Sequence, residues 1–293
     1  MTTLVTGGTG FVGRFVVEAL SREGHPVRVM GRTRPAAGFF TGPVGFVHGT
    51  LEPGADHARA MEGVTGLVHA AFDHLPGKYR GGEGGDAEGF RRRNLDGTAA
   101  LFQAAGRAGV ARAVFLSSRA VYGTQPPGAE LDEATQPRPD TLYGEVKLGG
   151  ERALAELAAD GLRGVSLRVT GVYGPAAPGA RHKWSSLFDD YLAGRAIEPR
   201  RATEVHGDDV AQAVLIALRE PAAWGALNVS DMLVDRRDLL AIVRDATGSP
   251  HPLPARSDDP VNAMTCGALS ALGWKPGGPD LLARTVRELL AGR

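Results

Sequence analysis

The sequence has little cysteine, little lysine and no excess charge of either sign. Its one cysteine, Cys266, excludes an internal disulfide and suits a reducing cytosol. Thirty-three basic and thirty-three acidic side chains cancel, so no attraction to nucleic acid or to an anionic membrane is expected. No apolar run reaches the roughly 18 residues that a membrane span needs. With no basic-then-apolar leader and no metal-ligand spacing, we expect a cytoplasmic protein without a metal, nucleic-acid or membrane partner.

Short apolar runs alternate with helical patterns through the first two-thirds of the chain. Helical patterns such as 11–24 and 88–109 separate most of the expected strands, which are 3–7, 27–30, 44–49, 66–71, 112–118 and 164–174. The apolar runs are continuous rather than alternating, as in strands that helices cover on both faces. This order predicts an α/β fold with a Rossmann-like, doubly wound parallel sheet.

The rhythm becomes irregular after residue 175, where Pro, Gly and Ala are frequent. Further helices are expected around 184–194 and 207–220. We expect a nucleotide-binding domain made of residues 1–175 with about 200–227. A smaller, partly discontinuous C-terminal lobe, about 176–199 and 228–293, would bind the substrate.

The first expected strand runs into TGGTGFVG, where Gly7, Gly10 and Gly13 have the spacing GxxGxxG. Each glycine has a physical role there: a tight turn, close approach of the backbone to a pyrophosphate, and close packing of helix on strand. The free N–H groups and the dipole at the start of the next helix favour an anion. The stretch predicts a dinucleotide site; a purely structural turn is the alternative.

The end of the second expected strand bears on which dinucleotide binds. An acidic residue there would hydrogen-bond the ribose hydroxyls of NAD and repel a 2′-phosphate. In VRVMGRTRP, Gly31 occupies that place, and Arg32 and Arg34 follow it. Two cations and no acid favour a 2′-phosphate, so we expect NADP rather than NAD. Two solvated surface arginines are the alternative.

Tyr143 and Lys147 stand four residues apart in a helical stretch and so share one face, in a chain with only five tyrosines and four lysines. A free tyrosine titrates at about 10 and is a weak base at neutral pH. A lysine cation at ~4 Å, with an effective dielectric near 20, favours the phenolate by about 4 kcal/mol before desolvation is counted. The pair predicts a proton acceptor, or a donor in the reverse direction; a surface aromatic beside a solvated lysine is the alternative.

Ser118 ends the fifth expected strand in FLSSRAVYG, at the carboxyl edge where α/β sheets bind ligands. Its hydroxyl would orient the substrate oxygen whose proton Tyr143 moves. A helix cap or a turn is the alternative for such a serine.

These stretches together resemble the extended short-chain dehydrogenase/reductases, also called NAD-dependent epimerase/dehydratases. The resemblance covers essentially the whole chain. It rests on TGGTGFVG, LVHAAF, NLDGTAALFQAAGRAGVARAVFLSSRAVYG, YGEVK, LRVTGVYGP, VHGDDVAQAVLIAL and ALSALGWKP. It implies the same Rossmann-like fold and a nicotinamide dinucleotide as cofactor.

Carried over residue by residue, the resemblance implies that Ser118, Tyr143 and Lys147 are catalytic, with Asn94 nearby as a structural or relay residue. Thr50 and Leu51 take the place of an Asp-Leu pair that contacts adenine in the family, but Thr50 has no carboxylate. The cofactor-binding residues would be Gly7, Gly10, Phe11, Val12, Gly13, Arg32, Arg34, Thr50, Leu51, Ala70, Ala71 and Ser117, together with Tyr143 and Lys147.

Two departures from the family pattern bear on the reaction. Dehydratases of this family carry Asp-Glu directly after the catalytic hydroxyl residue, whereas Arg119 and Ala120 stand here, which argues against 4,6-dehydration. Gly171 stands where many nucleotide-sugar binders of the family have Asn. For a UDP-type substrate, the resemblance implies Arg200 or Arg201, in a segment shorter than usual, as the phosphate contact. Arg119 would face a carboxylate or other anion of the substrate; a salt-bridged or solvated arginine is the alternative.

We therefore expect an NAD(P)-dependent epimerase or dehydrogenase/reductase, with hydride transfer at a carbinol or carbonyl carbon of a sugar or nucleotide sugar. Two alternatives stay open: an NADPH-dependent reductase of a non-nucleotide carbonyl substrate, and a non-catalytic NADP-binding sensor. A homodimer is expected, because the helices around 94–109 and 140–159 form the dimer contact in many relatives. Here those helices carry small residues that permit close packing, Gly106, Gly109, Gly144, Gly149 and Gly150.

Overall fold

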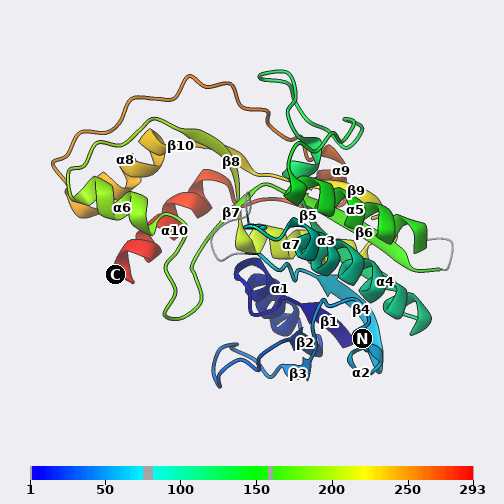
Figure 1. Ribbon diagram of the computed structural model, residues 1–293. Coiled ribbons are helices and arrows are strands. Elements are labelled where there is room, and N and C mark those ends of the chain that lie inside the picture. The colour runs from blue at the N-terminus through cyan, green and yellow to red at the C-terminus, as the bar shows by residue number, and fades with distance from the viewer. Residues whose placement is uncertain (1, 75–81, 158–160, 293) are drawn as a thin grey trace.

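The computed structural model describes residues 2–74, 82–157 and 161–292 and has a seven-stranded sheet at its centre (Figure 1). The strand order is β3-β2-β1-β4-β5-β6-β9, and each neighbouring pair is parallel. The strands are β1 (Thr2–Thr6), β2 (Val27–Gly31), β3 (Gly45–His48), β4 (Val64–His69), β5 (Arg112–Ser118), β6 (Arg163–Val169) and β9 (Gly225–Val229).

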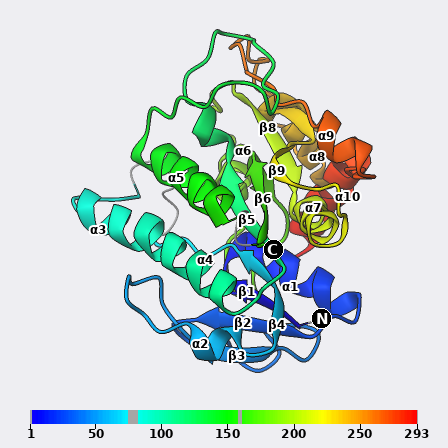
Figure 2. The same cartoon turned by 90° about the vertical axis from the view of Figure 1, so that its right-hand side faces the viewer.

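Helices cover both faces of this sheet (Figure 2). On one face α1 (Phe11–Arg22) and α7 (Gly207–Arg219) pack on a core that includes Val5 and Val114. On the other face α4 (Gly97–Arg107) and α5 (Leu142–Glu156) meet a core that includes Leu4 and Phe115. Adjacent strand residues thus enter opposite cores, which is why the apolar runs are continuous. The doubly wound α/β fold predicted from the sequence is confirmed.

A three-stranded sheet, in the order β10-β8-β7, lies beside the large one. It consists of β7 (Gly171–Tyr173), β8 (Arg201–His206) and β10 (Met232–Asp235). With α6 (Ser185–Leu192), α8 (Arg236–Thr247) and α10 (Gly278–Ala291) it encloses a separate core, which includes Trp184 and Phe188. The fold also contains two short helices, α2 (Ala58–Met61) and α9 (Gly267–Ala271). The division into two domains stays a prediction.

The expectation of one strand over 164–174 was wrong, because the chain changes sheets at Thr170. β6 pairs with β5 and β9, whereas β7 pairs with β8. The Thr170 amide donates to the carbonyl of Val229, while its hydroxyl donates to the carbonyl of Thr203, 2.9 Å away. One residue therefore bridges the two sheets and brings β7 to the carboxyl edge of the large sheet.

The expected helix over 88–109 is one uninterrupted helical segment, but its hydrogen-bonding pattern changes along its length. It begins as α3 (Ala87–Arg91), passes through one π-helical turn (Arg92–Asp96) and continues as α4. The Asp86 carboxylate caps the start by accepting from the Gly89 amide at 2.8 Å. Such single π-helical turns occur often at functional sites, and this one contains Asn94. None of the helices in the described ranges is long and apolar enough to cross a membrane.

Candidate active site

The predicted site residues meet at the carboxyl edge of the large sheet. β1 ends in the glycine loop, β4 leads into Ala70 and Ala71, and β5 ends at Ser118. Helix α5 then lays Tyr143 and Lys147 across this edge. The parallel sheet is what brings these distant segments together, since all its strands end on the same side.

The glycine loop makes a cradle that larger residues would fill. Gly7 has a φ of +69°, and a Cβ there would lie 2.5 Å from the amide nitrogen of Ala71. A Cβ at Gly13 would overlap the carbonyl oxygen of Gly7. Gly10 caps α1 without a side-chain hydrogen bond, which leaves the first amides of the helix for an anion. The loop fits the pyrophosphate of a dinucleotide, with Phe11 and Val12 half-buried in the first turn.

The two arginines after β2 are exposed. Arg32, whose side chain is 76% exposed, reaches Asp73 with a nitrogen-to-oxygen distance of 3.3 Å. Arg34 places its guanidinium carbon 5.0 Å from the centre of the Phe46 ring. An exposed ion pair of this kind contributes little stability and costs little to open. The contact of Arg32 with Asp73 is therefore a weak restraint on that side chain.

The residues that would flank the adenosine are packed by backbone contacts. The Ala71 amide donates to the Thr6 hydroxyl at 3.3 Å. The Thr50 hydroxyl accepts from the Glu52 amide at 3.3 Å, which makes it a turn residue. The carbonyl oxygen of Leu51 lies where a Cβ at Gly97 would be, so this loop sits directly on the start of α4.

Lys147 is buried, with 4% of its surface exposed, and its ammonium donates to the carbonyl of Leu116 at 2.7 Å. The nitrogen lies 5.8 Å from the centre of the Tyr143 ring and 4.4 Å from that of Phe72. Tyr143 itself is half-buried and packs edge-on against Phe72 at 5.1 Å. Burial lowers the pKa of Lys147 to about 7, and the carboxylate of Glu151 opposes that effect.

The two serines at the end of β5 have different surroundings. The Ser118 hydroxyl accepts from the Ala120 amide at 3.1 Å and caps a short 3₁₀ turn (Arg119–Tyr122), which leaves its proton for another partner. The Ser117 hydroxyl is buried and donates to Glu151 inside the fold. Ser118 thus keeps a donor at the end of β5, two residues after the Leu116 carbonyl that Lys147 binds, whereas Ser117 is bound to Glu151 of α5.

Asn94 holds the loop after β4. Its amide nitrogen donates to the carbonyls of Asp73 at 2.7 Å and Phe90 at 3.0 Å, and its oxygen accepts from the Asp73 amide at 2.7 Å. Asp73 in turn accepts from Arg93 at 2.6 Å. These bonds use every hydrogen of the Asn94 amide, so its place in the structure is that of a scaffold residue.

The predicted substrate arginines meet one segment of the lobe. Arg119 donates to the carbonyl of Asn262 at 3.1 Å, and Arg201 donates to that of Asp259 at 2.6 Å. Arg200 is exposed directly before β8. The segment 259–262 therefore connects the end of β5 with β8 across the face of the lobe.

Sequence reasoning missed an ion pair between Lys183 and Glu204. Glu204 is the register partner of Gly171, and a Cβ at Gly171 would lie 2.8 Å from both the Glu204 carboxylate and the Lys183 ammonium. Burial raises the pKa of Glu204, and Lys183 opposes that effect. The available signal in the sequence was Gly171, because the side chains of Lys183 and Glu204 fill the space that a side chain at this position would take.

Sequence reasoning also missed the buried pair of Glu151 and Arg168. Three nitrogen-to-oxygen distances between 2.8 and 3.2 Å join them directly behind Lys147. The available signal was Glu151 itself, an acid one helical turn after Lys147 on the same face.

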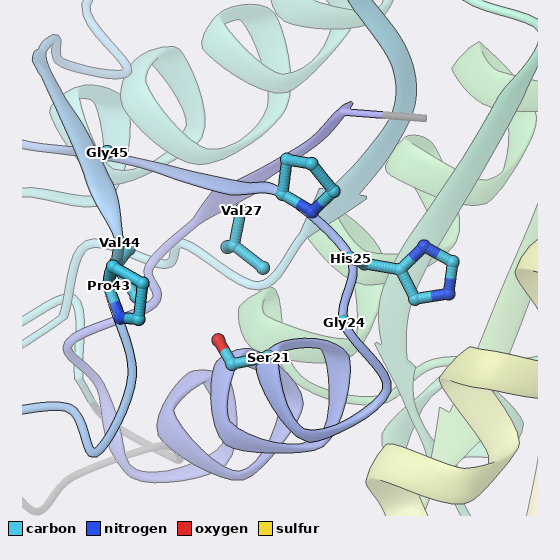
Figure 3. Close-up of a pocket in the computed structure, with 8 residues that line it drawn as sticks. Ser21, Gly24, His25, Val27, Pro43, Val44 and Gly45 are labelled. Atoms are coloured by element: carbon cyan, nitrogen blue, oxygen red, sulfur yellow. The ribbon is translucent and has the colours of Figure 1, made fainter.

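A hollow of about 580 Å³ lies at the other edge of the sheet, where β2 and β3 begin (Figure 3). Its lining comes from the end of α1 and from the starts of these two strands, namely Ser21, Gly24, His25, Pro26, Val27, Pro43, Val44 and Gly45. None of the residues predicted to be catalytic lines it. The candidate active site is thus defined by its side chains at the carboxyl edge and not by this hollow.

Comparisons with known proteins place the chain next to one family. The model of the NAD dependent epimerase/dehydratase family matches residues 3–230. A UDP-glucose 4-epimerase of Streptomyces lividans is 32% identical, over 95% of this chain and 92% of that protein. Two solved structures each cover 100% of this chain and 99% of their own, with TM-scores of 0.79. One is the UDP-glucose 4-epimerase of Thermus thermophilus with NAD, at 28% identity, and the other is MoeE5 with UDP-glucose and NAD, at 27% identity.

Proposed function

Since the chain belongs to the NAD dependent epimerase/dehydratase family, we propose that it is a nucleotide-sugar epimerase that acts through Ser118, Tyr143 and Lys147. The resemblance seen in the sequence is thereby confirmed, and the chain is an enzyme of this class. The observation that carries the proposal is the Lys147 ammonium, which is buried 5.8 Å from the centre of the Tyr143 ring on the helix that crosses the end of β5.

A nicotinamide dinucleotide, which the glycine loop and Lys147 would hold, would supply the hydride acceptor and donor of the proposed mechanism. Tyr143 takes the hydroxyl proton of the substrate as the carbinol carbon is oxidised, and gives it back on reduction. Lys147 favours the tyrosinate by its charge and would also bind the nicotinamide ribose. Ser118 donates to the reacting oxygen. If the keto sugar rotates in the site and receives the hydride on its other face, the product is the epimer. If the keto sugar leaves the site instead, the result is net dehydrogenation.

Epimerisation is favoured over net dehydrogenation by the names of the similar proteins, which include UDP-glucose 4-epimerases. Mixing the purified protein with UDP-glucose and a nicotinamide cofactor tests it. We expect the C4 epimer to accumulate without stoichiometric reduced cofactor in solution. A non-catalytic sensor would produce neither, and a carbonyl reductase would instead consume reduced cofactor with non-nucleotide substrates.

The substrate is proposed to be a nucleotide sugar because three cations lie on β8 or against it. Gly171 comes two residues after Val169, the register partner of Ser118, and the Lys183 ammonium lies beside Gly171, where it pairs with Glu204. Arg201 begins β8, three residues before Glu204, and Arg200 directly precedes it. A diphosphate would give these cations an anionic partner.

The cofactor class is a nicotinamide dinucleotide, and the similar solved structures contain NAD. For this chain we propose that NADP is accepted in preference to NAD, because Arg32 and Arg34 are exposed directly after β2 and Gly31 takes the place of the acid that would bind the ribose hydroxyls. Titration of emptied protein with each cofactor tests it. Arg32→Ala should weaken NADP binding about tenfold and leave NAD binding unchanged, as expected for one lost phosphate contact.

We propose a homodimer through α4 and α5, which only two of the five small residues expected at the contact now support. A Cβ at Gly144, Gly149 or Gly150 would meet atoms of this same chain, so these three glycines serve internal packing. Gly106 and Gly109 have open space beside them. Light scattering at micromolar concentration tests the proposal, and a monomer would contradict it.

A further inference from the structure

A row of polar side chains crosses the sheet behind the catalytic lysine. Ser117 of β5 is the register partner of Arg168 of β6, and Arg168 is the register partner of Asn228 of β9. All three are buried. Because they are direct neighbours across parallel strands, they present their side chains to the same face of the sheet, the one covered by α5.

Glu151 of α5 binds the first two members of this row. Its carboxylate accepts from the Arg168 Nε at 3.1 and 3.2 Å and from Nη2 at 2.8 Å, and it also accepts from the Ser117 hydroxyl. Only 8% of the Glu151 surface is exposed. A buried carboxylate needs this degree of compensation, and here every partner is itself fixed in the sheet.

The second guanidinium arm of Arg168 continues the network. It donates to the Tyr122 hydroxyl at 3.1 Å, and that hydroxyl lies 2.7 Å from the Asn228 side-chain oxygen. The Asn228 amide nitrogen donates to the carbonyls of Leu131 and Thr265. Arg168 is therefore held on both arms, and its side chain cannot leave Glu151 without opening buried hydrogen bonds.

The same turn of helix connects Glu151 to the catalytic residues. Tyr143, Lys147 and Glu151 follow one another at intervals of four residues and share one face of α5. Lys147 binds the carbonyl of Leu116, and Glu151 binds the hydroxyl of the next residue, Ser117. Two successive turns of the helix are thus attached to two successive residues of β5, directly before Ser118.

We propose that Glu151, held by Arg168 and Ser117, is a positioning residue that keeps Lys147 charged and in register with Tyr143. The inference rests on the proposed function, in which Tyr143 and Lys147 act on the substrate. Glu151 touches neither substrate nor cofactor in this role. It supplies the negative charge and the second attachment that a buried ammonium beside aromatic rings lacks on its own.

The charges around Lys147 give the sign of the effect. In the described part of the chain the titratable or charged groups that face it are Tyr143 and Glu151 on α5, His69 on β4 and, beyond Glu151, Arg168 on β6. Burial first, and then Lys147, lowers the pKa of His69 to about 3, so the imidazole is neutral. Removing the Glu151 charge leaves Lys147 with the Arg168 cation and without the anion between them, which favours the neutral form of Lys147 and withdraws support from the tyrosinate.

The test is the pH dependence of single-turnover nicotinamide reduction by a nucleotide sugar. The rate should rise with pH as Tyr143 loses its proton. In Glu151→Gln we expect this rising limb of the pH profile to move to higher pH by about one unit, which lowers the rate on the limb about tenfold. Glu151→Asp should restore much of the wild-type midpoint. Glu145→Gln is the matched control on the same helix, since Glu145 pairs with Arg91 at the surface and should leave the profile unchanged.

Arg168→Met separates positioning by charge from mere structural support. It removes the Arg168 cation and leaves the Glu151 carboxylate with the Ser117 hydroxyl as a donor and the charge of Lys147 as compensation. The midpoint of the rising limb should therefore stay at or below the wild-type value. A purely structural pair would give equal losses in Glu151→Gln and Arg168→Met with unshifted midpoints, which overturns the proposal. If a single variant fails to fold, Glu151→Gln/Arg168→Gln keeps hydrogen-bonding groups without charge, and an unshifted limb there overturns it as well.

Tyr143→Phe, measured beside these variants, separates this inference from the proposed function. Loss of turnover in Tyr143→Phe together with an unshifted limb in Glu151→Gln overturns only the role of Glu151. Full turnover in Tyr143→Phe overturns the proposed function, and the role of Glu151 with it.

Discussion

The glycine loop and the lobe around β8 offer an anion different kinds of contact. At the glycine loop the contacts on offer are backbone amides, and the absence of Cβ atoms at Gly7 and Gly13 leaves room beside them. In the lobe, long side chains carry the charge, as Lys183 does against Glu204 and Arg201 against the Asp259 carbonyl. A site made of backbone amides tolerates almost no change in shape, whereas the ligand of a site made of side chains can change through single substitutions. We therefore expect variants of the glycine loop to lose the cofactor, and variants of Lys183 or Arg201 to change the affinity for the substrate.

The largest effect is expected at Tyr143, the residue proposed to move the proton of the substrate. Tyr143→Phe removes the hydroxyl that moves the proton and should lower kcat by about 10²–10⁴-fold, the usual contribution of general acid–base catalysis. Steady-state epimerisation measures it. Cofactor affinity should stay near the wild-type value, and a variant with wild-type kcat would show that Tyr143 has no catalytic part.

Gly13→Ala tests the backbone site. The added Cβ would overlap the Gly7 carbonyl oxygen, so the loop must shift, at a cost of about 1–3 kcal/mol in the free energy of unfolding. Cofactor affinity, measured by calorimetry, should fall at least tenfold. Gly106→Ala is the control, since nothing lies within 4 Å of its Cβ position on α4. It should stabilise the protein by about 0.5–1 kcal/mol.

Lys183→Met tests the side-chain site. Loss of the ammonium removes one charged contact to the substrate, and we expect KM for a nucleotide sugar to rise about tenfold with kcat changed much less. The cofactor affinity should be that of the wild type. An unchanged KM would mean that the Lys183–Glu204 pair is structural only.

The smallest effect concerns the junction of the two regions, where the Asp209 carboxylate on α7 accepts from the Gly277 amide. Burial raises the pKa of Asp209 to about 6, above its ordinary value of 3.8. The folded protein thus binds this proton more tightly, so Asp209 costs stability above pH ~6 and the cost disappears as the pH falls below ~4. Asp209→Asn should raise the free energy of unfolding at pH 8 by about 1 kcal/mol. A larger gain at acid pH than at pH 8, in thermal melts, would contradict this sign.

The features that could be predicted from the sequence are the local ones. Gly7, Gly10 and Gly13 are close in sequence and have geometric roles that only glycine fills. Tyr143 and Lys147 are joined by one helical turn. Most strands of the large sheet could be located because their apolar runs are continuous, and the doubly wound, parallel arrangement followed from the family resemblance and from the alternation of strand and helix.

The features that could not be predicted depend on segments far apart in the chain. Glu151 meets Arg168 only because α5 covers β6, and Lys183 meets Glu204 only because β7 joins β8. The change of sheets at Thr170 gave no signal, since one apolar run serves both strands equally well. The bond from Arg119 to the Asn262 carbonyl could not be predicted either, since no local pattern gives the position of that segment. The contact of Arg119 with the substrate stays a prediction.

The most direct test of the central claim follows the hydrogen at C4 of the sugar. UDP-glucose carrying deuterium at C4 is incubated with the protein and its nicotinamide cofactor, and both the nucleotide sugar and the free cofactor are analysed by NMR and mass spectrometry. We expect the C4 epimer with its deuterium retained, because the hydride taken up beside Tyr143 and Lys147 returns to the same carbon. Deuterium accumulating in free reduced cofactor, or no epimer at all, would contradict a nucleotide-sugar epimerase.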